Sequence, residues 1–174
     1  DGLTLQRLRE HYAAVRSGLG ARKTPAEFGA VPHEPYSHTP WNRCAQQPGM
    51  TGQVKEGILA RYGELGVRVD RGRIVFDSVV LDPAELLGEC GVIEGTDTIA
   101  PAGSVGLTVC GVPVVVRFGE ADGIRVRKVH DFTDVTGPVL PTDLSRQVFA
   151  RTGQITAIEV TLTPRFPDQI VVVG

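Results

Sequence analysis

The chain has 174 residues, 41% of them hydrophobic and 22% charged, and 18 Lys and Arg side chains nearly balance 20 Asp and Glu side chains. This length is enough for one domain with a proper hydrophobic core and a short extension. The formal net charge of −2 provides no basic surplus for binding phosphates. No stretch approaches the roughly 20 apolar residues of a membrane span. We therefore expect neither nucleic acid nor a membrane as a partner.

The N-terminus and the cysteines give weaker indications. Residues 1–4 are Asp-Gly-Leu-Thr, and no basic segment followed by an apolar one begins the chain, so we expect no signal peptide. Because an initial Met is also missing, we expect the chain to be part of a longer protein. Cys44, Cys90 and Cys110 form no C-x-x-C pair, which argues against a disulfide framework or a structural zinc site. Their odd number favours a reducing, cytoplasmic compartment.

Helical patterns dominate the first 66 residues. Apolar residues at helical spacing predict an amphipathic helix over residues 4–19 and a second helix over residues 51–65, ending near Gly66. Between them, Thr24-Pro25-Ala26-Glu27 resembles a capping box and predicts one short helical turn. Residues 30–50 contain four prolines and form a long polar loop. We predict a helical segment over residues 1–66 that includes this loop.

Beyond Gly66 the hydrophobic period changes from 3.6 to about 2, which indicates strands. Residues 67–80 predict a hairpin, residues 82–85 a short helical turn, and residues 88–103 a Gly-rich loop. Further strands are predicted over residues 104–110, 112–118, 123–130, 154–163 and 169–173. Short strands without long crossover helices predict a mainly β fold, an antiparallel, jelly-roll-like β-sandwich over residues 67–174. The predicted core consists of Val105, Leu107, Val109, Val114, Val116, Ile124, Val126, Ile155, Ile158 and Val160.

The loop over residues 30–50 carries the strongest candidate binding residues. Loops of about twenty residues are usually functional, disordered or wrapped on a partner. Tyr36 and Trp41 could act as flat apolar platforms beside fork-like hydrogen-bonding groups, a mixture that suits sugars. The alternative is that both rings anchor the loop to the domain. The candidate ligand-binding residues are Tyr36, His38, Trp41, Asn42, Arg43, Gln46 and Gln47.

No complete catalytic constellation is apparent, so the catalytic residues are unknown. Metal binding by His33, Glu34, His38 and Cys44 is disfavoured, because these residues lack helical ligand spacing and lie in a Pro-stiffened loop. We expect no metal and no cofactor. A hydrolase triad could be assembled from Ser104, Ser145, His130 and Asp131. Neither serine lies in a G-x-S-x-G elbow, which argues against that chemistry.

The order of elements resembles a known architecture. The segments PYSHTPWNRCAQQPGMTGQVKEGILARYGELGV, GRIVFDSVVLDP and GSVGLTVCGVPVVVRF resemble the C-terminal part of large glycoside hydrolases and phosphorylases built on an (α/α)6 toroid. In that family the last toroid helix leads into a small β-sandwich that packs on the catalytic barrel. The resemblance covers roughly residues 30–130 and includes no catalytic motif. It implies that the acid and base residues lie upstream, in a separate catalytic domain.

Two classes of function follow from these observations. The first is a non-catalytic, C-terminal accessory domain of a carbohydrate-active enzyme that contacts sugar. The second is a free-standing protein-interaction module without enzymatic activity. A reading frame that continues several hundred residues upstream with helical periodicity would favour the first, and a start codon just before Asp1 would favour the second.

Overall fold

The structure is a computed structural model that describes residues 2–18, 59–77 and 79–166. The chain separates into two units, Asp1–Arg61 and Tyr62–Gly174, and each is described by itself. The first unit contains α1 (Gly2–Gly18), which confirms the helix predicted over residues 4–19. Residues 59–64 are also helical, in agreement with the end of the predicted second helix. No helix in these described ranges is long and apolar enough to cross a bilayer. The predicted division after residue 66 stays a prediction.

Three other predicted segments lie outside the described residues. They are the beginning of the second helix, the capping box with the loop that follows it, and the strand over residues 169–173.

Gly66 ends the second helix for a steric reason. Its φ of +80° lies in the left-handed region, which glycine adopts without strain. A Cβ added to Gly66 would lie 2.0 Å from the carbonyl oxygen of Asp77. The Asp77 N–H donates to the Gly66 carbonyl oxygen at 2.7 Å. The backbone of residue 77 therefore approaches so closely that only glycine fits, and the predicted helix end is confirmed.

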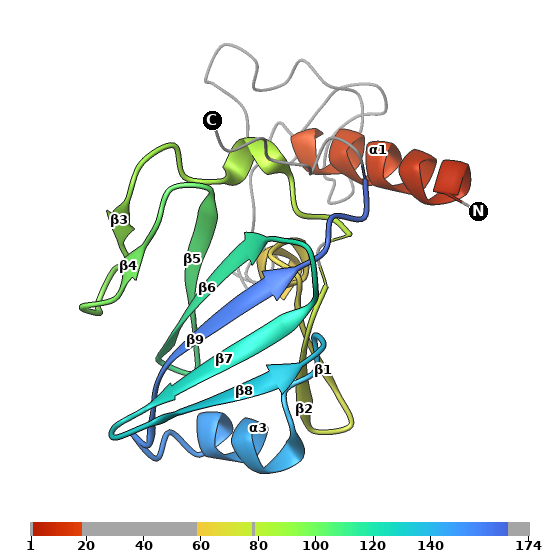
Figure 1. Cartoon of the computed structure of the whole chain (residues 1–174). Coiled ribbons are helices and arrows are strands. Elements are labelled where there is room, and N and C mark those ends of the chain that lie inside the picture. The colour runs from red at the N-terminus through yellow and green to blue at the C-terminus, as the bar shows by residue number, and fades with distance from the viewer. Residues whose placement is uncertain (1, 19–58, 78, 167–174) are drawn as a thin grey trace, which may run out of the picture. The chain divides into compact units, whose positions relative to one another are not determined.

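The second unit is mainly β, as predicted, and its largest element is a five-stranded sheet in the order β5-β6-β9-β7-β8 (Figure 1). Two hairpins, β1-β2 and β3-β4, accompany it. A 3₁₀ turn, η1 (Pro83–Glu85), begins at the predicted Asp82 cap, and α3 spans Thr142–Phe149. The strands are β1 (Val67–Asp70), β2 (Arg73–Phe76), β3 (Gly91–Val92), β4 (Ile99–Ala100), β5 (Ser104–Val109), β6 (Val112–Phe118), β7 (Gly123–Lys128), β8 (Phe132–Thr136) and β9 (Ile155–Leu162).

The sheet is mixed, which corrects the wholly antiparallel arrangement expected from the sequence. β9 pairs parallel with β6 and antiparallel with β7. β6 and β7 are joined by residues 119–122, yet β9 lies between them. The chain passes from β8 through α3 to β9, so α3 is a crossover helix that the sequence analysis did not identify. β8 and β9 both run antiparallel to β7 and therefore run in the same direction, and strands of the same direction need a crossover connection such as this one. The predicted loop over residues 88–103 also contains the β3-β4 hairpin.

The hydrophobic core lies between one face of the five-stranded sheet and a layer formed by the β1-β2 hairpin and α3 (Figure 1). All ten residues predicted for the core are buried, each at most 8% exposed. From the other layer, Ile74 and Phe76 of β2 pack into the same cluster as Leu144 and Val148 of α3. Backbone hydrogen bonds join β2 to the segment just before α3: the Leu140 N–H donates to the Ile74 carbonyl oxygen, and the Phe76 N–H donates to the Pro138 carbonyl oxygen.

The β3-β4 hairpin covers part of the opposite face of the sheet. Ile93 and Ala100 form a second, small apolar cluster with Val115 of β6. The hairpin can lie this close because Gly106 of β5 has no side chain. A Cβ at Gly106 would lie 2.7 Å from Cγ1 of Ile93 and 3.1 Å from Cβ of Ala100. Because it lies so close to the sheet, the hairpin forms one wall of a pocket on this face.

Candidate functional site

The ligand-binding residues predicted from the sequence all lie outside the described residues. Their role as a sugar site, and the alternative role of two of them as loop anchors, stay predictions. In the described ranges, no group of three or more His, Cys, Asp or Glu side chains is placed to hold a metal ion. The predicted ligand-binding residues that lie outside the described ranges are Tyr36, His38, Trp41, Asn42, Arg43, Gln46 and Gln47.

The two serines of the discarded hydrolase triad have structural roles. Ser104 is fully buried, and its hydroxyl donates to the Pro101 carbonyl oxygen at 2.6 Å. Ser145 is also fully buried. Its hydroxyl donates to the Leu140 carbonyl oxygen at 3.0 Å and accepts from the Ile74 N–H at 3.1 Å. Neither hydroxyl is accessible to a substrate, so neither serine is a nucleophile.

The side chains that can bind a ligand are on the sheet face opposite the core, which we call the outer face. Because side chains alternate along a strand, each core residue is followed by one that points outward. In β7, Ile124 and Val126 are buried, whereas Arg125 and Arg127 are exposed. The strand register places Arg125 between Glu159 of β9 and Asp134 of β8. The outer face thus carries a row of alternating charges across three strands.

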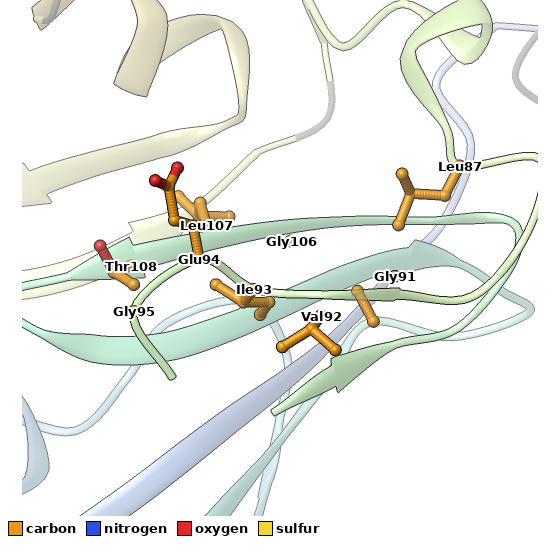
Figure 2. Close-up of a pocket in the computed structure, with 10 residues that line it drawn as sticks. Leu87, Gly91, Val92, Ile93, Glu94, Gly95, Gly106, Leu107 and Thr108 are labelled. Carbon is orange, nitrogen blue, oxygen red and sulfur yellow. The ribbon is translucent and has the colours of Figure 1, made fainter. Parts of the chain in front are cut away.

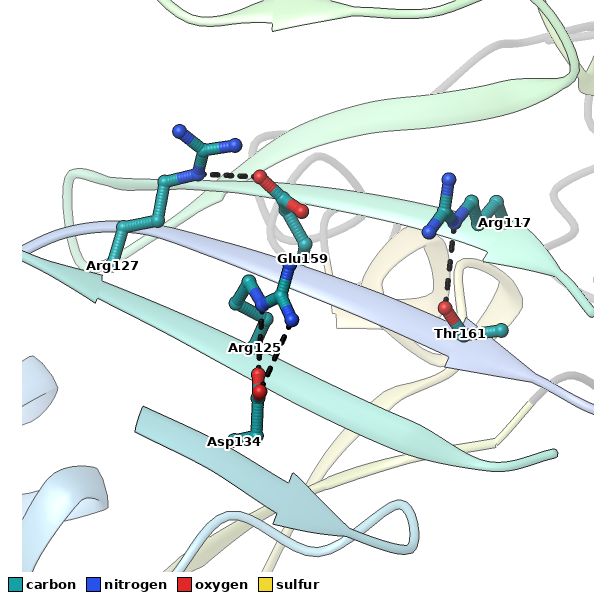
Figure 3. Close-up of polar contacts among 6 residues, drawn as sticks. All are labelled: Arg117, Arg125, Arg127, Asp134, Glu159 and Thr161. Carbon is teal, nitrogen blue, oxygen red and sulfur yellow. Dashed lines mark hydrogen bonds and ion pairs between the residues drawn. The ribbon is translucent and has the colours of Figure 1, made fainter. Parts of the chain in front are cut away.

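Ion pairs organise the outer face (Figure 3). Arg125 donates two hydrogen bonds to the carboxylate of Asp134, from Nε at 2.8 Å and from Nη2 at 3.1 Å. These bonds lower the pKa of the Asp134 carboxyl and raise the pKa of the Arg125 guanidinium. Two residues further along β7, Nε of Arg127 donates to Oε1 of Glu159 on β9. Such pairing holds long side chains in fixed orientations that a ligand can use.

Arg117 differs from these two arginines. It lies on β6, and its Nε donates only to the hydroxyl of Thr161, at 3.4 Å (Figure 3). Within the described part of the chain, no carboxylate lies within ion-pair distance of Arg117. Most donors of its guanidinium therefore remain available to a ligand.

A pocket of about 550 Å³ lies where the β3-β4 hairpin meets the outer face. The sheet supplies Arg117, Arg127 and Glu159, together with the apolar side chains of Val115 and Ala157. The hairpin and the residue after it supply the opposite wall, which consists of Asp97, Thr98, Ile99 and Pro101. Two guanidinium groups and two carboxylates give this pocket no formal net charge. Apolar surface beside a few convergent polar groups is typical of small-molecule sites.

A second pocket, of about 510 Å³, adjoins the first on the outer face. Arg127 and Thr156 line both pockets, so the two lie side by side, and we call them together the groove. The second pocket also contains Phe132 of β8, a large apolar side chain that is 60% exposed. The guanidinium of Arg125 lies over the Phe132 ring, 4.8 Å from its centre.

A third pocket, of about 450 Å³, lies between the β3-β4 hairpin and β5 (Figure 2). Its side chains are mainly apolar, from Leu87, Val92, Ile93 and Leu107, and Glu94 supplies its only charge. Three glycines contribute to its lining, and they provide no side-chain hydrogen-bonding groups. This pocket therefore offers few groups that could orient a polar ligand, and we assign the candidate site to the outer-face groove.

Comparisons with known proteins give no family assignment. No protein-family model matches the chain, and no curated protein matches it significantly. The functional interpretation must therefore come from the chemistry of the groove itself.

Sequence reasoning missed the groove although one signal for it was present. The alternation in residues 123–128 already places Arg125 and Arg127 on the face opposite the core. What the sequence did not provide was the strand order, which brings Glu159 beside both arginines.

Proposed function

We propose that this chain is a non-catalytic β-domain that binds a neutral carbohydrate in the pocket between the β3-β4 hairpin and the outer face. In this proposal it serves as the accessory domain of a carbohydrate-active enzyme, whose catalytic domain lies upstream. The observation that carries the proposal is the pocket lining. It combines two guanidinium groups and two carboxylates, without net charge, with apolar side chains on both walls.

The polar groups of the pocket match the hydrogen-bonding pattern of a sugar. Adjacent hydroxyls both donate and accept, so they need an acceptor and a donor side by side. Glu159 and Arg127 supply that combination, and their mutual hydrogen bond holds them in place before a ligand arrives. Arg117 adds further donors. The exposed apolar side chains of Ile99 and Pro101 can contact the C–H surface of a sugar ring.

Binding is favoured over catalysis because the carboxylates of the pocket lack a suitable setting. Glycoside hydrolysis requires a carboxylic acid that keeps its proton, as apolar surroundings allow, facing a second carboxylate. Glu159 instead accepts a hydrogen bond from Arg127 and is 32% exposed. Asp97 lies on the hairpin and is exposed. This setting supports recognition and provides no proton donor.

The test is calorimetric titration of the full chain with short neutral oligosaccharides of different sugar types, at up to millimolar concentration. Glu159→Gln removes the charge and one acceptor while preserving shape, so it should weaken binding of the sugar that the wild type binds by about tenfold, as loss of a charge-assisted bond predicts. Asp70→Asn is the matched control, because Asp70 forms an ion pair with Arg73 and lines neither pocket. Absence of binding by the wild type, or equal effects of both variants, would contradict the proposal.

A protein-interaction module is the second candidate, and exposed apolar side chains favour it. Val92 is 68% exposed and Ile99 is 62% exposed, both on the β3-β4 hairpin. If this hairpin binds a protein, Val92→Asp should abolish that interaction and leave sugar binding intact, because Val92 does not line the sugar pocket.

The predicted loop site is tested separately by Trp41→Ala, which should abolish sugar binding with little change in melting temperature if Trp41 contacts the ligand.

A further inference from the structure

We propose that the groove continues past the pocket to Phe132, and that the ligand is a linear neutral oligosaccharide with one unit stacked on the Phe132 ring. This inference rests on the proposed function, since it extends the same site. Its starting observation is that Arg127 and Thr156 line both the first and the second pocket. The two pockets therefore lie side by side across the sheet, where one extended ligand can reach both.

The strand register defines the length of this surface. Phe132 on β8 is paired with Arg127 on β7, and Arg127 is paired with Ala157 on β9. β6, which carries Arg117, is the next strand. Strands in a sheet lie about 4.8 Å apart, so the three steps from β8 to β6 span roughly 14 Å. A single sugar ring does not reach across that distance, whereas a short chain of sugar units does.

The Phe132 ring is held in position and exposed at the same time. Asp134 fixes the guanidinium of Arg125 through two hydrogen bonds, and that guanidinium lies over the ring. The ring nevertheless remains 60% exposed. An aromatic side chain that is already ordered loses little conformational freedom on binding. Its exposed apolar surface is suited to the C–H groups of a sugar ring.

The charges of the second pocket argue for a neutral ligand. Each Arg and Lys side chain in its lining already has a carboxylate partner, so these side chains carry no surplus charge that would attract a polyanion. The three pairs are Arg125 with Asp134, Arg127 with Glu159, and Lys128 with Asp131. Anionic ligands such as nucleic acid or sulfated sugars would have to displace these carboxylates. A neutral oligosaccharide can bind without separating them.

The experiment compares chain lengths. The full chain is titrated with the di- and tetrasaccharides of the sugar series that the wild type binds. The tetrasaccharide should bind the wild type roughly tenfold more tightly, as one aromatic contact predicts. Phe132→Ala should remove this gain and leave disaccharide affinity unchanged, and Phe132→Tyr should retain the gain. Val129→Ala is the matched control, because Val129 is 52% exposed nearby but does not line the groove.

The possible failures are distinguishable. If the wild type binds di- and tetrasaccharide equally, or if Phe132→Ala leaves the gain intact, the extension to Phe132 is wrong and the pocket can still bind sugar. The extension is also wrong if Phe132→Ala weakens both ligands equally. If the wild type binds neither ligand in any sugar series, the proposed function itself fails.

Discussion

Ser145 provides the sharpest test of how the two layers of the β unit are held together. This buried hydroxyl connects α3 to β2: it accepts from the Ile74 N–H and donates to the Leu140 carbonyl oxygen. Ile74, Leu140 and Ser145 are all 0% exposed, so water cannot replace the lost partner. Ser145→Ala should therefore leave the buried Ile74 N–H without its acceptor and the buried Leu140 carbonyl oxygen without the hydroxyl donor.

The magnitude follows from the cost of unsatisfied groups. Each buried unpaired polar group costs about 1–3 kcal/mol, and carbonyl oxygens tolerate this better than N–H groups. We expect Ser145→Ala to lower the free energy of unfolding by about 2–3 kcal/mol, mostly through the Ile74 N–H. For a domain of about 100 residues, this corresponds to a fall in melting temperature of roughly 8–24 °C.

Urea denaturation followed by circular dichroism measures this loss, with thermal unfolding as a second readout. Arg146→Ala is the control, because Arg146 lies on the same helix but is exposed. It should change the free energy of unfolding by less than about 0.5 kcal/mol. If Ser145→Ala also costs less than about 0.5 kcal/mol, the hydroxyl does not join the two layers as described.

Three further perturbations test other parts of the fold. Gly66→Ala should destabilise the unit strongly, because a Cβ would collide with the Asp77 carbonyl oxygen at 2.0 Å, and a melting temperature within a degree or two of the wild type would exclude that geometry. Ile158→Ala, in the fully buried centre of β9, should cost about 2–5 kcal/mol in urea denaturation. The hydrogen bond from Arg125 lowers the pKa of Asp134, so this pair stabilises the fold above the pKa of the unfolded carboxyl and loses that effect as the pH falls through the folded pKa. The difference in stability between wild type and Asp134→Asn should therefore shrink on acidification, and a difference that grows in acid would contradict this sign.

The hydrophobic core could be predicted from the sequence because burial follows the two-residue period of each strand. Every predicted core residue, from Val105 to Val160, is buried in the structure. The elements that were missed have a weak pattern. β8 is an edge strand with only intermediate burial on its inner positions, so Phe132 to Thr136 show no clear apolar alternation. In α3, the buried Ser145 interrupts the apolar face, and the helix spans only Thr142–Phe149.

The strand order could not be predicted, because it depends on contacts between residues far apart in the chain. Residues 119–122 are a short connection between β6 and β7, yet β9 lies between these two strands. This insertion has a direct consequence for the site. It brings Glu159 beside Arg127, 32 residues away in sequence. The groove is therefore a product of topology, whereas the loop with Tyr36 and Trp41 was selected from composition alone and lies outside the described residues.

The central claim is that the outer face of the five-stranded sheet binds a neutral sugar chain. The most direct test is amide chemical-shift mapping of the ¹⁵N-labelled chain during titration with a neutral tetrasaccharide that it binds. We expect the largest shifts on Arg117, Arg127, Glu159 and Phe132, with smaller shifts on the β3-β4 hairpin. Shifts confined to other surfaces, including the loop over residues 30–50, or no shifts with any sugar series at millimolar concentration, would contradict it.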